Sequence, residues 1–141
     1  SRLDQSCPLC RQLGIEAVHP GRSRIMNESP LFTRTYDFLL WMIPHTIKFP
    51  RVHRFGLGER IQQLALNFQD TLVAAGKSHG SRRIEYLQKA DIQLEQMRVW
   101  LRFSRDNNLL TINQYEHGAR LVTEIGKLLG TWLKQNTFPA S

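Results

Sequence analysis

The sequence predicts an all-α protein, folded as an antiparallel up-down-up-down four-helix bundle. Apolar residues recur at spacings of three and four in four successive segments, the pattern of helices with one buried face. No segment shows the alternation of apolar and polar residues that is typical of a strand. Short connections separate the segments, so each helix is expected to pack on its neighbour in the sequence.

The chain length of 141 residues suits one domain. We expect the four-helix bundle over residues 31–137. Residues 1–30 carry several prolines, glycines and serines and few periodic apolar positions, which predicts a poorly defined N-terminal extension. Residues 138–141 are expected to form a C-terminal tail.

The first helix is predicted over residues 31–48. Six apolar residues are expected on its buried face: Phe32, Tyr36, Leu39, Leu40, Ile43 and Ile47. Pro44 lies inside this pattern and removes a backbone donor, so a kink or an early break is expected there. Pro50 should end the helix, and a loop is expected over residues 49–56.

The second helix is predicted over residues 57–77, and Gly76 marks its end. Its single apolar stripe consists of Leu57, Ile61, Leu64, Ala65, Phe68, Leu72 and Ala75. The third helix should begin after Gly80, with Ser81 as its N-cap. Its core stripe consists of Ile84, Leu87, Leu94, Met97 and Leu101.

The polar residues 106–108 close the third helix, and Thr111 is expected to cap a fourth helix that ends near Asn136. The predicted core face of this helix consists of Ile112, Tyr115, Ala119, Val122, Leu129 and Leu133.

The last two helices carry more apolar surface than the core of one bundle needs. The additional apolar residues are Ile92, Val99 and Phe103 on the third helix and Leu121, Ile125, Leu128 and Trp132 on the fourth. One interpretation is a broad, partly exposed face, and the other is a subunit interface between copies of the chain. Gly126 and Gly130 would let another backbone come close to the fourth helix.

A basic charge balance indicates a polyanionic partner. Nineteen lysines and arginines against twelve acidic residues leave a formal charge of +7, with a pI of about 10.0. The third helix carries a row of Arg98, Arg102 and Arg105, and the fourth carries a row of Arg120, Lys127 and Lys134. Further candidates in the connections are Arg51, Arg54 and Lys77.

Such rows match the way in which proteins hold phosphate backbones, through charge and the forked guanidinium group. The alternative is an ordinary solvated or paired face, because Arg98 can pair with Glu95 and Arg120 with Glu124 on the same helix. Both interpretations stay open from the residues alone.

Signals for metal binding and catalysis are absent from the sequence. Glu116 and His117 are adjacent and diverge by about 100° on a helix, so they cannot form the inward Glu-x-x-His pair of di-iron bundles. Cys7 and Cys10 lack the two further ligands of a structural zinc site, although His19 offers a third ligand. No nucleophile and base are paired, so we expect neither a cofactor nor enzymatic activity.

No apolar run approaches the roughly 18–20 residues that a membrane span requires, and the first residues do not form a secretory signal. We therefore expect a cytoplasmic protein without a membrane partner.

Three segments resemble those of the accessory variability determinant (Avd) family of diversity-generating retroelements, in the same order. They are Val73-Ala-Ala-Gly-Lys-Ser78, Met97-Arg-Val-Trp-Leu-Arg-Phe103 and Glu124-Ile-Gly-Lys-Leu-Leu-Gly-Thr-Trp-Leu133. Pro44 and Pro50-Arg51 also resemble the family's first connection. The likeness covers residues 36–135, and its third segment is the most specific because bundle packing alone does not demand it.

The resemblance implies a four-helix bundle that assembles into a pentameric ring with basic outer surfaces. It implies that the protein binds a reverse transcriptase and its template RNA or an RNA/DNA hybrid, and that it supports mutagenic cDNA synthesis and retrohoming without catalysing a reaction. Arg98 and Arg102 correspond to arginines of the family's third helix, and Lys127 corresponds to a lysine of its fourth.

Two alternatives remain. The Phe49-Pro-Arg and Arg54-Phe-Gly-Leu-Gly-Glu59 segments equally resemble four-helix-bundle proteins encoded in intervening sequences of 23S ribosomal RNA. A structural homo-oligomer without a nucleic-acid role is the third hypothesis.

Overall fold

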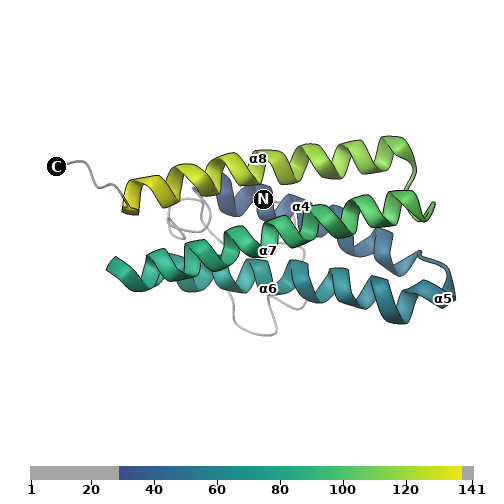
Figure 1. Ribbon diagram of the computed structural model, residues 1–141, viewed down its shortest axis with the longest axis horizontal. Coiled ribbons are helices and arrows are strands. Elements are labelled where there is room, and N and C mark those ends of the chain that lie inside the picture. Colours follow the sequence, from purple (N-terminus) through teal and green to yellow (C-terminus); the bar gives the residue numbers. More distant parts are fainter. Residues whose placement is uncertain (1–28, 138–141) are drawn as a thin grey trace, which may run out of the picture.

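The computed structural model describes residues 29–137, and within them the chain is helical and contains no strand (Figure 1). Four long helices are α4 (Pro30–Ile47), α6 (Glu59–Gly76), α7 (Gly80–Asp106) and α8 (Ile112–Thr137). A short helix α5 (Arg51–His53) and a π-helical turn η1 (Arg54–Gly58) lie between α4 and α6. The prediction of an all-α protein with four main helices is confirmed.

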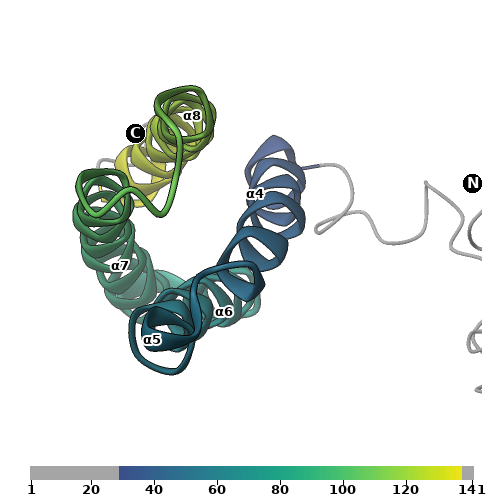
Figure 2. The same cartoon turned by 90° about the vertical axis from the view of Figure 1, so that its right-hand side faces the viewer.

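Each long helix contacts two others: α4 and α7 both pack against α6 and α8. The end-on view shows α4 and α7 on opposite sides of the molecule, with α6 and α8 between them (Figure 2). The core lies between these helices and contains about twenty apolar side chains, such as Met42, Leu72, Met97 and Leu129. None of the helices within residues 29–137 is long and apolar enough to span a membrane.

The buried face of α4 differs from the predicted one. The structure buries Leu31, Phe32, Thr35, Phe38, Met42 and Thr46. Two threonines are tolerated there because their hydroxyls donate to carbonyl oxygens of the same helix, Thr35 to Leu31 at 2.8 Å and Thr46 to Ile43 at 2.7 Å.

The prediction that Tyr36, Leu40 and Ile47 lie in the core is wrong, because more than half of each residue's surface is exposed. The polar threonines interrupt the apolar periodicity, so the sequence pattern indicates a face rotated away from the real one. The helix itself continues past Pro44 to Ile47, close to the predicted end.

The loop expected over residues 49–56 is largely helical. Backbone amides of His53 and Arg54 both donate to the carbonyl of Pro50, which starts a turn directly after the end of α4. Gly58 explains the close packing of this turn, since a Cβ atom there would lie 3.3 Å from the carbonyl oxygen of Thr46. Gly58, which resembles a loop residue in the sequence, is therefore part of a packed helical connection.

The helix ends combine confirmed and corrected predictions. Thr111 and Gln114 form a reciprocal capping box: the Gln114 amide donates to Thr111 Oγ1 at 3.1 Å and the Thr111 amide to Gln114 Oε1 at 2.9 Å. Ser81 is not the N-cap of α7, which begins one residue earlier at Gly80. Ile112, predicted in the core, is 68% exposed because it is the first residue of α8.

Candidate nucleic-acid and subunit interfaces

Arg98 lies across the junction of α7 and α8. Its Nη1 donates to Glu95 Oε1 at 2.7 Å, the intrahelical pair that the sequence allowed. Its other terminal nitrogen lies over Gly126, where a Cβ atom would come within 2.6 Å of Nη2. The side chain is 40% exposed, so the guanidinium is braced and still reaches solvent. Gly126 therefore accommodates a side chain of its own subunit.

Arg105 and Arg102 complete the α7 row in different ways. Arg105 pairs with Asp106 at 2.8 Å, and its guanidinium carbon lies 4.6 Å from the ring centre of Tyr115 on α8. The hydrogen bond to Asp106 raises the pKa of Arg105 above its ordinary value. Arg102 is exposed and has no ion pair within residues 29–137.

The α8 row is exposed and lacks the predicted intrahelical ion pair. Glu124 pairs with Arg34 of α4 at 2.6 Å instead of with Arg120, and this hydrogen bond raises the pKa of Arg34. Arg120 and Lys127 line a shallow groove of about 700 Å³ along α8. Within the described part of the chain, Arg120, Lys127 and Lys134 form no salt bridge. The groove also contains Glu116 and Glu124, so its lining carries both signs of charge.

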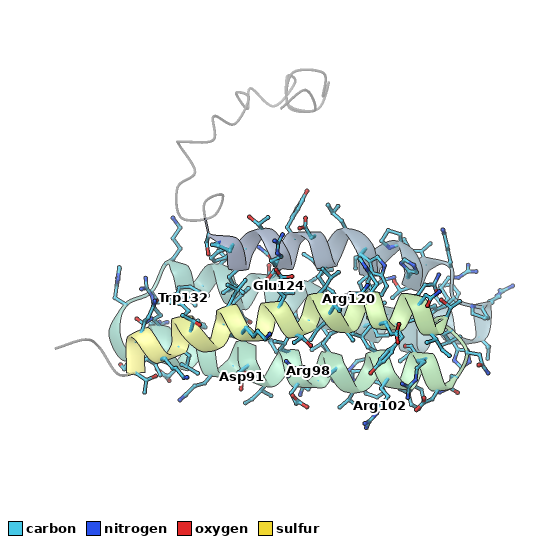
Figure 3. All side chains as sticks on the ribbon, turned by 90° about the horizontal axis from the view of Figure 1, so that it is seen from above. Asp91, Arg98, Arg102, Arg120, Glu124 and Trp132 are labelled. Carbon is cyan, nitrogen blue, oxygen red and sulfur yellow. The ribbon has the colours of Figure 1, made fainter. Side chains whose placement is uncertain are left out.

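The two basic rows lie on different sides of α8. Figure 3 shows Arg120 and Glu124 on its α4 side and Arg98 and Arg102 on its α7 side. The candidate cations in the connections lie at opposite ends of the bundle. Arg51 and Arg54 follow α4, whereas Lys77 follows α6 (Figure 1). All three of these side chains are exposed. The structure thus separates the predicted cations into several surfaces.

The apolar residues proposed for a subunit interface also separate. Ile92, Val99 and Phe103 are exposed on α7. On α8, Leu121, Leu128 and Trp132 are partly buried against the core. Ile125 is 0% exposed, so its assignment to an interface between subunits is wrong. The other helices of the same bundle cover it, which sequence spacing alone does not reveal.

An exposed apolar stripe lies on α4, at positions that the sequence pattern predicts in the core. It consists of Tyr36, Leu40 and Ile47. The helix α4 itself lies on the opposite side of the molecule from α7 (Figure 2). The apolar pattern was visible in the sequence, but it was interpreted as core because the polar Thr35 and Thr46 concealed the true buried face.

The described residues hold no group of three or more His, Cys, Asp or Glu side chains arranged for a metal ion. His45 and His117 both lie against the indole of Trp41, with ring centres 4.5 and 5.4 Å from it. Cys7, Cys10 and His19 lie outside the described residues.

Comparison with known families adds to this geometry. A family model described as bAvd-like matches residues 31–136, which include all four long helices almost to their ends. No curated protein sequence matches the chain. Because the family model spans most of the sequence, the chain belongs to the bAvd-like family.

Proposed function

We propose that this protein is a non-catalytic accessory factor of a diversity-generating retroelement. It binds the reverse transcriptase and template RNA, or an RNA/DNA hybrid, and thereby supports mutagenic cDNA synthesis and retrohoming. Membership of the bAvd-like family carries this proposal and favours it over the role of a protein from a ribosomal RNA intervening sequence. The exposed cations of α7 and α8 supply the chemistry that such binding needs.

Lys127 is the strongest single phosphate ligand in this proposal. It is exposed, it lines the groove of α8 together with Arg120, Glu116 and Glu124, and it forms no salt bridge within residues 29–137. Arg98 contributes a guanidinium whose direction is set by Glu95 and Gly126. A guanidinium fork on α7 and an ammonium group on α8 together suit a phosphate backbone that passes over both helices.

The test is a salt titration of RNA binding and of reverse-transcriptase binding. Lys127→Ala, Arg98→Ala and Arg102→Ala should each weaken RNA binding and lower the salt slope by about 0.7 to 0.9 for each lost phosphate contact. Lys89→Ala is the matched control, because Lys89 is an exposed cation outside both rows. Unchanged RNA affinity and salt slope in all three variants would contradict the proposed phosphate contacts. The hypothesis of a structural homo-oligomer without a nucleic-acid role would then be favoured.

The up-down-up-down bundle is proposed to assemble into a pentameric ring. The support is two exposed apolar stripes, one of Ile92, Val99 and Phe103 on α7 and the other on α4. Two different apolar stripes on two helices favour head-to-tail association, which gives a ring where the rotation between subunits closes.

Light scattering on the full chain tests this assembly. Val99→Glu should dissociate the oligomer because a buried unpaired charge costs several kcal/mol, of the order of 3–5. Gln63→Glu places the same charge at an exposed position of α6 and should leave the oligomer intact. A wild-type chain that is monomeric at every concentration would rule out the ring.

A further inference from the structure

The connection between α4 and α6 presents apolar side chains to solvent at one end of the bundle. Val52 of α5 is 82% exposed and Phe55 of η1 is 65% exposed. They lie three residues apart, on either side of the junction between α5 and the π-helical turn. Figure 1 shows this turn at the end of the molecule that also holds the connection between α7 and α8.

The turn is held firmly although its tip is exposed. Phe49 is only 2% exposed and anchors the chain before the turn, while the absence of a side chain at Gly58 permits contact with Thr46 after it. Gln62 Nε2 donates to Thr46 Oγ1 at 2.8 Å and ties the start of α6 to α4. The exposure of Phe55 is therefore a property of a packed connection.

Basic residues flank these two side chains along the chain. Lys48, Arg51, Arg54 and Arg60 are exposed, and Glu59 is the single acidic residue between Lys48 and Arg60. No salt bridge within residues 29–137 involves any of these five residues. Arg54 Nε donates weakly to the Phe49 carbonyl at 3.4 Å, which leaves its two terminal nitrogens for another acceptor.

We propose that this connection binds an unpaired stretch of nucleic acid, with a base stacked on Phe55 and the flanking phosphates held by Arg51 and Arg54. The inference rests on the proposed RNA-binding function and names the form of RNA and the stacking residue. Stacking platforms beside basic side chains are the usual means by which proteins hold single strands.

Size and shape select this ligand. The exposed ring of Phe55 offers a platform on the scale of one base, whereas a protein partner usually needs about 800 Å² of contact on each side. A duplex does not fit either, because paired bases are not available for stacking and the deep major groove of A-form RNA excludes side chains.

The experiment compares binding of an oligouridylate with binding of an RNA duplex of equal length. Phe55→Ala should weaken binding of the single strand by about 5- to 100-fold and leave duplex binding and the salt slope nearly unchanged, because stacking releases no counterions. Phe55→Trp should retain single-strand binding. Arg51→Ala should instead lower the salt slope.

Ile112→Ala provides the matched control, since Ile112 is equally exposed at the same end of the bundle but begins α8 among polar residues. It should bind both RNAs like the wild type. Circular dichroism and light scattering establish that each variant keeps its helices and assembly.

The outcomes separate the two proposals. A wild-type chain that binds neither RNA overturns the proposed function and this inference together. Wild-type binding with an unchanged single-strand preference in Phe55→Ala overturns the stacking inference alone. Loss of reverse-transcriptase binding without loss of single-strand binding would assign the connection to the protein partner and equally overturn it.

Discussion

Two glycines on α8 each lie against a large side chain of a neighbouring helix, one from α4 and the other from α7. The two side chains differ in rigidity. Gly118 faces α4, and a Cβ atom there would lie 2.7 Å from two ring carbons of Trp41. Gly126 faces α7, and a Cβ atom there would lie 2.6 Å from the guanidinium tip of Arg98. The distances are almost equal, but a rigid indole fills one site and the end of a flexible cation fills the other.

At Gly118 α8 packs against a rigid ring of α4, whereas at Gly126 it contacts a side chain of α7 that reaches solvent. Trp41 is enclosed by His45, His117 and Phe38, so its ring has little room to move away from α8. Arg98 is partly exposed and is held mainly by Glu95. We therefore expect changes at Gly118 to affect stability and changes at Gly126 to affect ligand binding.

The largest expected effect is at Gly118. Gly118→Val should lower the free energy of unfolding by about 3 kcal/mol, because the added atoms overlap the Trp41 ring and force α4 and α8 apart. Thermal and denaturant unfolding measure this loss. RNA affinity should remain unchanged at temperatures where the variant is folded.

Gly130→Ala is the matched control for this comparison. Nothing lies within 4 Å of the Cβ position at Gly130, so alanine should raise stability by up to about 1 kcal/mol through its better helix propensity. Equal destabilisation by a side chain at Gly118 and at Gly130 would contradict the packing role of Trp41.

An intermediate effect is expected at Gly126. Gly126→Ala should displace the Arg98 guanidinium and reduce RNA affinity roughly fivefold, the equivalent of one hydrogen bond of about 1 kcal/mol. Stability should stay within about 1 kcal/mol of the wild type, because the flexible tip can move and alanine favours the helix. Binding data from an Arg98→Ala background provide the check: there, the Gly126 substitution should have no additional effect.

The smallest effect is expected for the ion pair between α4 and α8. Arg34 and Glu124 are each nearly half exposed, so removing either partner should lower the stability only slightly. A double-mutant cycle with Arg34→Ala and Glu124→Ala should give a coupling energy that shrinks as salt is added. A large coupling that persists in high salt would mean that this side of α8 is held by charge as well as by Trp41.

Local sequence patterns predict the helical segments of this protein well and the contacts between the helices less well. The capping box at Thr111 and the exposed α7 stripe depend on residues a few positions apart, which local spacing specifies. The predicted buried face of α4 is wrong because Thr35 and Thr46, although polar, are buried. Their hydroxyls donate hydrogen bonds to carbonyl oxygens of the same helix. Exposure of Phe55 also escaped prediction, since it depends on how the connection packs on α4.

Sequence by itself determined that this protein is all-helical, basic and similar to the Avd family. The tertiary structure determines which residues form ion pairs. Glu124 pairs with Arg34, ninety residues away in the chain, and not with Arg120 on the preceding turn of α8. The tertiary structure also decided that Ile125 is covered and that Arg98 lies over Gly126. Helix periodicity is a local property of the chain, whereas the coverage of a broad apolar arc and the choice between two ion pairs depend on which helices lie beside it.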